Sequence, residues 1–108
     1  MAFGFPAYHE ELITNVPAGT DLKLSVWNTL MNLGWSPREG TNEFLGGTNV
    51  NLSSWGERVS VRFGPDGSAL VRSQCSLPTQ CIDWGKNKKN VQQFMQELPK
   101  HFAVAQNH

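Results

Sequence analysis

The sequence predicts a single α+β domain, in which an antiparallel meander of four to five strands carries two helices on one face, in the order β-α-β-β-β-β-α. Apolar residues recur at helical spacing after Thr20 and again after Asp83, and apolar and polar residues alternate between those two segments. A chain of 108 residues leaves room for one core. We expect the domain to span residues 1–99 and residues 100–108 to form a frayed tail, because that segment has no clear period.

Composition and charge narrow the class of protein. Hydrophobic residues make up 39 % of the chain and charged residues 17 %, which is enough apolar surface to fold. Nine Lys and Arg balance nine Asp and Glu. The neutral total excludes a general attraction to nucleic acid or to an anionic membrane, so any charged site must be local.

A short strand and a helix are predicted first. Residues 9–16 form the strand, which stops at Pro17-Ala18-Gly19. Thr20 or Asp21 caps the following helix, and Gly34 ends it in a left-handed conformation that turns Trp35 back onto the last turn. The apolar positions of this helix are Leu22, Val26, Leu30 and Leu33.

The middle of the chain has the period of β-strands. Trp35-Ser36 is a short strand or its remnant, broken by Pro37 and by a turn at residues 38–42. Gly46-Gly47 marks a bulge or a place where another segment packs close to the backbone. The positions on one face of this strand are Phe44, Gly46, Thr48, Val50 and Leu52.

A hairpin follows, and its turn sets the register. The motif Gly64-Pro65-Asp66-Gly67 fits a type I turn closed by a left-handed glycine, which pairs Gly64 with Ser68. Phe63 then pairs with Ala69, and every second pair along the hairpin points into the core. The outward face of the hairpin therefore carries Arg58, Arg62 and Arg72.

The last helix begins near Asp83 and ends at Pro99. Its apolar stripe is Val91, Phe94, Met95 and Leu98. Lys86, Lys88 and Lys89 occupy its first turns, where positive charge opposes the helix dipole.

The segment from the last strand into this helix holds the densest group of unusual residues. One hypothesis is a structural latch of Ser73, Asp83, Gly85 and Asn87, in which Asp83 caps the helix and Asn87 reaches back to the preceding loop. The other hypothesis is an anion site, made of the exposed N–H groups of the helix start with Lys86, Lys88 and Lys89. Caps are commoner than binding sites, which favours the latch.

The same segment resembles the R-S-x-S…D-x-G-x-N signature of uncharacterised bacterial domains of unknown function. The matching positions are Arg72, Ser73, Cys75 in place of the second serine, Asp83, Gly85, Asn87 and Val91. The match covers about a quarter of the chain. Since such domains have no established activity, the resemblance implies a fold element rather than a function.

Arg58, Arg62 and Arg72 form a second candidate surface, with Leu70 and Leu45 beside them. These arginines suit a phosphate or an acidic partner, and the alternative is a solvated face that keeps an open sheet soluble. Nucleic acid is disfavoured, because no aromatic residue alternates with the arginines to stack bases. Trp55 is either a lid over the core edge or a binding contact, and Trp84 is expected in the core.

Catalytic and metal-binding motifs are absent from the sequence, and we expect no cofactor and no metal. Two cysteines, Cys75 and Cys81, are expected as thiols in a reducing cytoplasm, although a disulfide between them is an alternative. Cys81 lies just before a helix start with lysines nearby, which lowers a thiol pKa, so a thiol-dependent enzyme or redox protein using Cys81, with Cys75, remains an alternative function.

The leading hypothesis is a small non-catalytic binding or assembly module with a local basic surface. Its expected partners are another protein or a second copy through the open sheet face, or a small anion. A weak nucleic-acid or phosphate binder is a further alternative. The chain has no apolar run long enough for a signal peptide or a transmembrane segment, so we expect a cytoplasmic protein.

Overall fold

The computed structural model describes residues 8–48, 57–65, 67–75 and 86–104. Its elements run β1 (Tyr8–Ile13), α1 (Leu22–Asn32), β2 (Arg38–Gly40), β3 (Glu43–Gly47), β4 (Glu57–Phe63), β5 (Ala69–Cys75), α2 (Lys86–Glu97) and a 3₁₀ turn at Leu98–His101. The predicted α+β class and the order β-α-β-β-β-β-α are confirmed.

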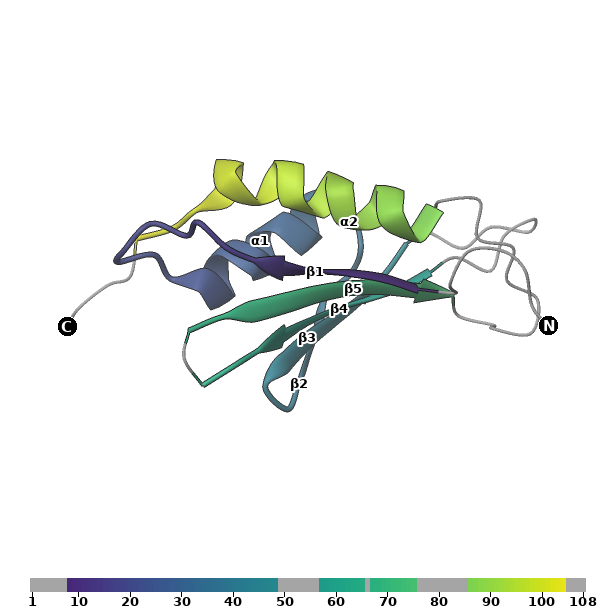
Figure 1. Ribbon diagram of the computed structural model, residues 1–108, viewed down its shortest axis with the longest axis horizontal. Helices are drawn as coiled ribbons and strands as arrows, with labels where there is room; N and C mark the ends of the chain where they lie inside the picture. The colour runs from purple at the N-terminus through teal and green to yellow at the C-terminus, as the bar shows by residue number, and fades with distance from the viewer. Residues whose placement is uncertain (1–7, 49–56, 66, 76–85, 105–108) are drawn as a thin grey trace.

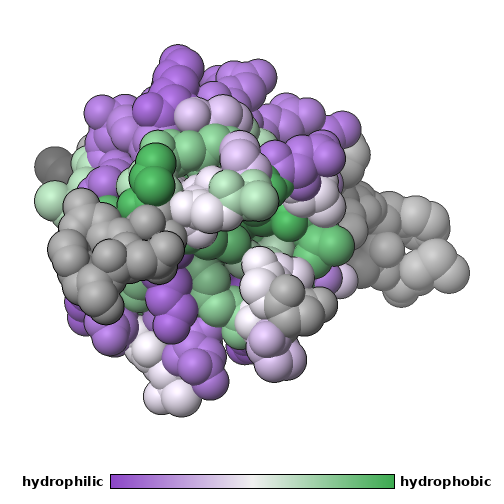
Figure 2. Space-filling view, turned by 90° about the vertical axis from the view of Figure 1, so that its left-hand side faces the viewer, coloured by the Kyte–Doolittle hydropathy of each residue, from purple (hydrophilic) through white to green (hydrophobic). Residues whose placement is uncertain are grey.

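The five strands form one antiparallel sheet in the order β1-β5-β4-β3-β2. Both helices lie on the same side of this sheet, and none of the described helices covers its other side, which we call the uncovered side (Figure 1). The first strand therefore pairs with the last, and β1 and β2 form the two edges. Figure 2 views one end of this arrangement and shows hydrophobic residues in a middle band, with hydrophilic side chains above and below.

The core lies between the helices and the covered face of the sheet. Val26 and Leu30 of α1 and Phe94 of α2 have no solvent exposure, as expected from their helical spacing. They meet the inward residues of the central strands, among them Val61 and Val71. Trp27, Phe44 and Phe63 extend this core with edge-to-face ring contacts at centroid distances of 5.2 and 5.1 Å.

Both ends of α1 follow local sequence signals. Asp21 is the N-cap, and its side chain accepts a hydrogen bond from the Leu24 N–H at 3.1 Å. Gly34 adopts a left-handed conformation with φ +75°, and the Trp35 N–H donates to the Leu30 carbonyl at 3.0 Å. The chain thereby turns Trp35 back into the core, where it is buried.

Gly46 lies where the backbone of Trp35 passes β3. A Cβ atom added at Gly46 would stand 2.7 Å from the Trp35 carbonyl oxygen, and that same oxygen accepts from the Gly47 N–H at 2.9 Å. The close approach expected at Gly46-Gly47 is therefore confirmed, and the neighbouring segment is the exit of α1. The expected continuation of this strand, Val50 and Leu52, lies outside the described residues.

The predicted hairpin is also confirmed. Strands β4 and β5 pair Phe63 with Ala69, Val61 with Val71 and Val59 with Ser73. The Gly64 N–H donates to the Ser68 carbonyl at 2.8 Å, and Gly67 is left-handed with φ +83°.

Other segments differ from the expectation. Arg38–Gly40, predicted as part of a turn, is strand β2, because a tighter turn at Thr41-Asn42, with Asn42 at φ 57°, brings Gly40 opposite Glu43. The first strand starts at Tyr8 and ends at Ile13, instead of spanning residues 9–16.

The tail after Pro99, which we expected to fray, is hydrogen-bonded to the start of α1, and Val104 forms a β-bridge with Thr20. The Ala103 N–H donates to Ser25 Oγ at 2.9 Å, and the Ala103 carbonyl accepts from the Asp21 N–H at 2.7 Å. Phe102 packs against the core. These contacts link residues distant in the sequence, so local periodicity carries no trace of them.

Candidate functional site

The uncovered side of the sheet gathers four arginines, Arg38, Arg58, Arg62 and Arg72, which we call the arginine face. Residues directly opposite one another in a sheet share a face. The row Arg38, Leu45, Ser60, Arg72 and Glu10 crosses the whole sheet, and the neighbouring rows add Arg58 and Arg62 on the same side. The predicted placement of Arg58, Arg62 and Arg72 on one face is confirmed, and Leu45 and Leu70 lie with them.

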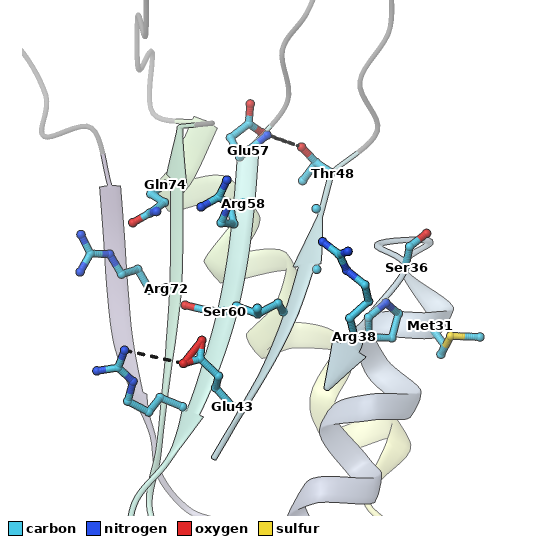
Figure 3. A pocket seen from close by; sticks show the side chains of 15 residues that line it. Met31, Ser36, Arg38, Glu43, Thr48, Glu57, Arg58, Ser60, Arg72 and Gln74 are labelled. Carbon is cyan, nitrogen blue, oxygen red and sulfur yellow. Dashed lines mark hydrogen bonds and ion pairs between the residues drawn. The ribbon is translucent and has the colours of Figure 1, made fainter. Parts of the chain in front are cut away.

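A groove of about 920 Å³ runs over this face. All four arginines line it, and so do Glu43 and Glu57. Met31 and Pro37, from the end of α1 and the approach to β2, add apolar surface on one side. Figure 3 shows Arg38 rising from β2 on one side of β3, with Arg58 and Arg72 projecting from β4 and β5 on the other.

Two of the arginines have carboxylate partners. Arg62 lies 3.8 Å from a carboxylate oxygen of Glu43, and Arg72 lies 3.8 Å from one of Glu10. The Arg72 guanidinium also stands 4.1 Å from the centre of the Tyr8 ring, within cation–π range. These contacts balance part of the positive charge of the face.

Arg38 and Arg58 differ from that pair. Both are exposed, and neither lies within 4.0 Å of a carboxylate among the residues that the structure describes. They flank Gly47, which pairs directly with Arg58 and has no side chain to fill the space between them. This part of the groove therefore presents uncompensated positive charge.

Tyr8 is a residue of this surface that the sequence analysis missed. The expected strand began one residue later, and the aromatic residue on the face was taken to be absent. Tyr8 pairs with Gln74 through the contact of the first strand with the last, a long-range pairing that no local pattern reveals. The available signal was the alternation of Tyr8 with Glu10 and Leu12.

Ser73 and Asn87, two residues of the predicted latch, belong to a polar network on the covered side, which we call the Glu57 network: Thr48, Glu57, Ser73, Asn87, Asn90 and Lys86. The Ser73 hydroxyl donates to Asn87 Oδ1 at 2.8 Å, and Asn90 Nδ2 lies 3.2 Å from the same hydroxyl. Asp83 and Gly85 lie outside the described residues, so their part in the latch stays a prediction.

Glu57 is the centre of this network. Its side chain is 7 % exposed. Its carboxylate accepts from Asn90 Nδ2 at 2.8 Å and from the Thr48 hydroxyl at 3.1 Å, and it lies 3.3 Å from Lys86 Nζ. A buried carboxylate is stable only with such partners.

The lysines of the expected anion site therefore have different surroundings. All three lysines are exposed on the first turns of α2, but Lys86 is paired with the chain's own Glu57. The N–H groups proposed to bind an anion belong in part to residues outside the described ranges. What the structure brings together at Lys86 is an internal ion pair.

The remaining candidate residues lie at the end of a described segment or outside the described residues. Cys75 ends β5, while Cys81, Trp55 and Trp84 lie outside the described residues. Among the described residues, no group of three His, Cys, Asp or Glu side chains is arranged to hold a metal ion. No described helix is long and apolar enough to cross a membrane.

No known family model matches this chain, and no curated protein matches it significantly. The resemblance of residues 72–91 to uncharacterised bacterial domains therefore stays a prediction.

Proposed function

We propose that this chain is a small non-catalytic binding module that uses its arginine face to bind an acidic segment of a partner protein. The observation that carries the proposal is the groove itself, because four arginines line it and two of them, Arg38 and Arg58, meet no carboxylate within the described ranges. Arginine suits this task, since its planar fork binds carboxylates and phosphates with two parallel hydrogen bonds.

Charge argues against the alternatives that the sequence left open. A second copy stacked through the same face would bring the unpaired Arg38 and Arg58 of both copies into one interface, where like charges repel. Single-stranded nucleic acid is typically bound by bases that stack on exposed aromatic rings, and the ring of Tyr8 is already covered by Arg72. An acidic protein segment requires neither self-complementarity nor stacking.

An NMR titration with a capped octaglutamate peptide tests this function. We expect saturable shifts of the amide resonances of β2 to β5, and weaker binding at higher salt because exposed charges are screened. The double variant Arg58→Gln/Arg72→Gln should weaken binding at least fivefold. Lys88→Gln/Lys89→Gln removes the same charge from α2 and serves as the matched control, with an expected change below twofold.

Two results would contradict the proposal. One is a peptide that shifts no resonance of the arginine face at low salt. The other is an equal loss of affinity in both double variants, which would mean that the peptide responds to total charge and not to the groove.

A further inference from the structure

The four arginines of the groove divide into two classes. Arg62 and Arg72 each have an opposite charge from the chain itself at 3.8 Å. Arg38 and Arg58 have no such partner among the described residues. Glu43, whose side chain shares this face, is also paired, with Arg62, and the Glu57 carboxylate lies in the Glu57 network on the covered side.

Gly47 separates the two unmatched arginines. Arg38 stands on β2 and Arg58 on β4, with β3 between them. Their Cα atoms are about 12 Å apart, because neighbouring strands are separated by about 4.8 Å and the two positions are offset by two residues along the strands. Arginine side chains are long enough to bring both guanidinium groups to one small anion over Gly47, which itself has no side chain.

From this geometry we infer that the groove contains a phosphate-binding subsite over Gly47, formed by Arg38 and Arg58, and that it takes a phosphorylated serine or threonine of an extended partner segment. This inference rests on the proposed function and names the acidic group that anchors the partner. We call this place the Gly47 subsite.

Charge and donor number favour a phosphate over a single carboxylate. Two guanidinium groups offer two positive charges, and a phosphomonoester carries about −1.5 to −2 at pH 7 with three acceptor oxygens. A carboxylate has one negative charge and is satisfied by one arginine. Ser60 and Gln74, which line the same groove from β4 and β5, add uncharged hydrogen-bonding groups.

The dimensions of the groove favour a peptide over a free phosphate. A volume of about 920 Å³ is many times that of a phosphate group. Apolar side chains lie along the same groove, including Met31, Pro37 and Leu45. They provide contacts for the residues on either side of the phosphorylated one, as expected when pockets beside an anion site contribute to recognition.

The test uses a capped seven-residue peptide of glycine and serine with one central phosphoserine, titrated into the full chain and followed by NMR. We expect saturable shifts at the amides of Gly47 and Arg58. The same peptide with glutamate in the centre should bind at least tenfold more weakly, and the unmodified serine peptide should produce no shifts.

A matched pair of double variants locates the subsite. Arg38→Gln/Arg58→Gln should weaken binding of the phosphoserine peptide at least tenfold. Arg62→Gln/Arg72→Gln removes the same charge from the same face and should change the dissociation constant by less than threefold. A third variant, Gly47→Ala, places a methyl group in the subsite without changing charge and should also weaken binding, by about fivefold.

Several outcomes would overturn the inference. Equal affinity for the glutamate and phosphoserine peptides would show that the groove does not select phosphate. Equal losses of affinity in the two double variants would show that binding does not depend on the Gly47 subsite. Inorganic phosphate that binds as tightly as the phosphoserine peptide would identify a free anion as the ligand, and an eight-nucleotide oligouridylate that binds more tightly would identify RNA. Binding of octaglutamate without binding of the phosphoserine peptide overturns this inference and leaves the proposed function standing, whereas loss of both overturns both.

Discussion

Charged side chains have different surroundings on the two faces of the sheet. On the covered face, the Glu57 carboxylate has Asn90, Thr48 and Lys86 within 3.3 Å. On the uncovered face, Arg38 and Arg58 have no carboxylate partner among the described residues. Burial explains the contrast, because an unpaired charge inside the protein is far more costly than one in water. Unpartnered charge is therefore tolerated only where solvent or a ligand can reach it.

The neighbouring glycines Gly46 and Gly47 provide the sharpest test of this contrast. Gly46→Ala should destabilise the fold by about 3 kcal/mol, because its Cβ would stand 2.7 Å from the Trp35 carbonyl oxygen and the backbone would have to move. Gly47→Ala should change stability by less than about 1 kcal/mol, because the nearest atom to its Cβ, the Glu57 carbonyl oxygen, is 3.5 Å away. Urea denaturation of both variants measures the difference in stability. Similar midpoints would mean that the Trp35 carbonyl leaves room for a Cβ atom at position 46.

The glutamates of the two faces provide the next comparison. Glu57→Ala should cost about 2 kcal/mol, because Asn90 and Thr48 lose their shared acceptor inside the protein. Glu43→Ala removes an ion pair with a largely exposed arginine on the other face and should cost no more than about 0.5 kcal/mol. Thermal and urea unfolding both measure these losses, and an equal cost at the two positions would contradict the distinction between the faces.

The smallest effect concerns pH at the far end of α2. A hydrogen bond from Lys100 and the neighbouring charges of Lys100 and His101 hold the pKa of Glu97 below its ordinary value. A lowered pKa in the folded state adds stability that is complete above the unfolded pKa, about 4.3, and is lost as pH falls through the folded pKa. The difference in unfolding free energy between the wild type and Glu97→Gln should therefore shrink below about pH 4. A difference that stays constant from pH 7 to pH 3 would show that Glu97 acts without its charge.

Predictions from local patterns agree well with the structure where neighbours in the sequence make the contact. The cap at Asp21, the left-handed Gly34 and the pairing of Phe63 with Ala69 each depend on residues close together in the chain. The outward direction of Arg58, Arg62 and Arg72 follows from the same hairpin register. These parts of the candidate site were therefore accessible from the sequence.

The other parts of the site depend on contacts between distant segments. Arg38 joins the arginine face only because a two-residue turn aligns β2 with β3, and Tyr8 reaches Arg72 only because the first strand pairs with the last. Glu57 and Asn90 are 33 positions apart in the sequence, and no periodicity links them.

The amino-acid pattern alone establishes the α+β class, the order of elements and the arginines of the hairpin, because hydrophobic period and turn chemistry act over a few residues. Tertiary structure alone decides which charges are matched. It places the buried Glu57 beside Lys86 and leaves Arg38 and Arg58 around Gly47 without a carboxylate in the described part of the chain. The physical reason is that charge pairing depends on distances of a few ångströms between side chains, and those distances exist only once distant strands and helices have packed.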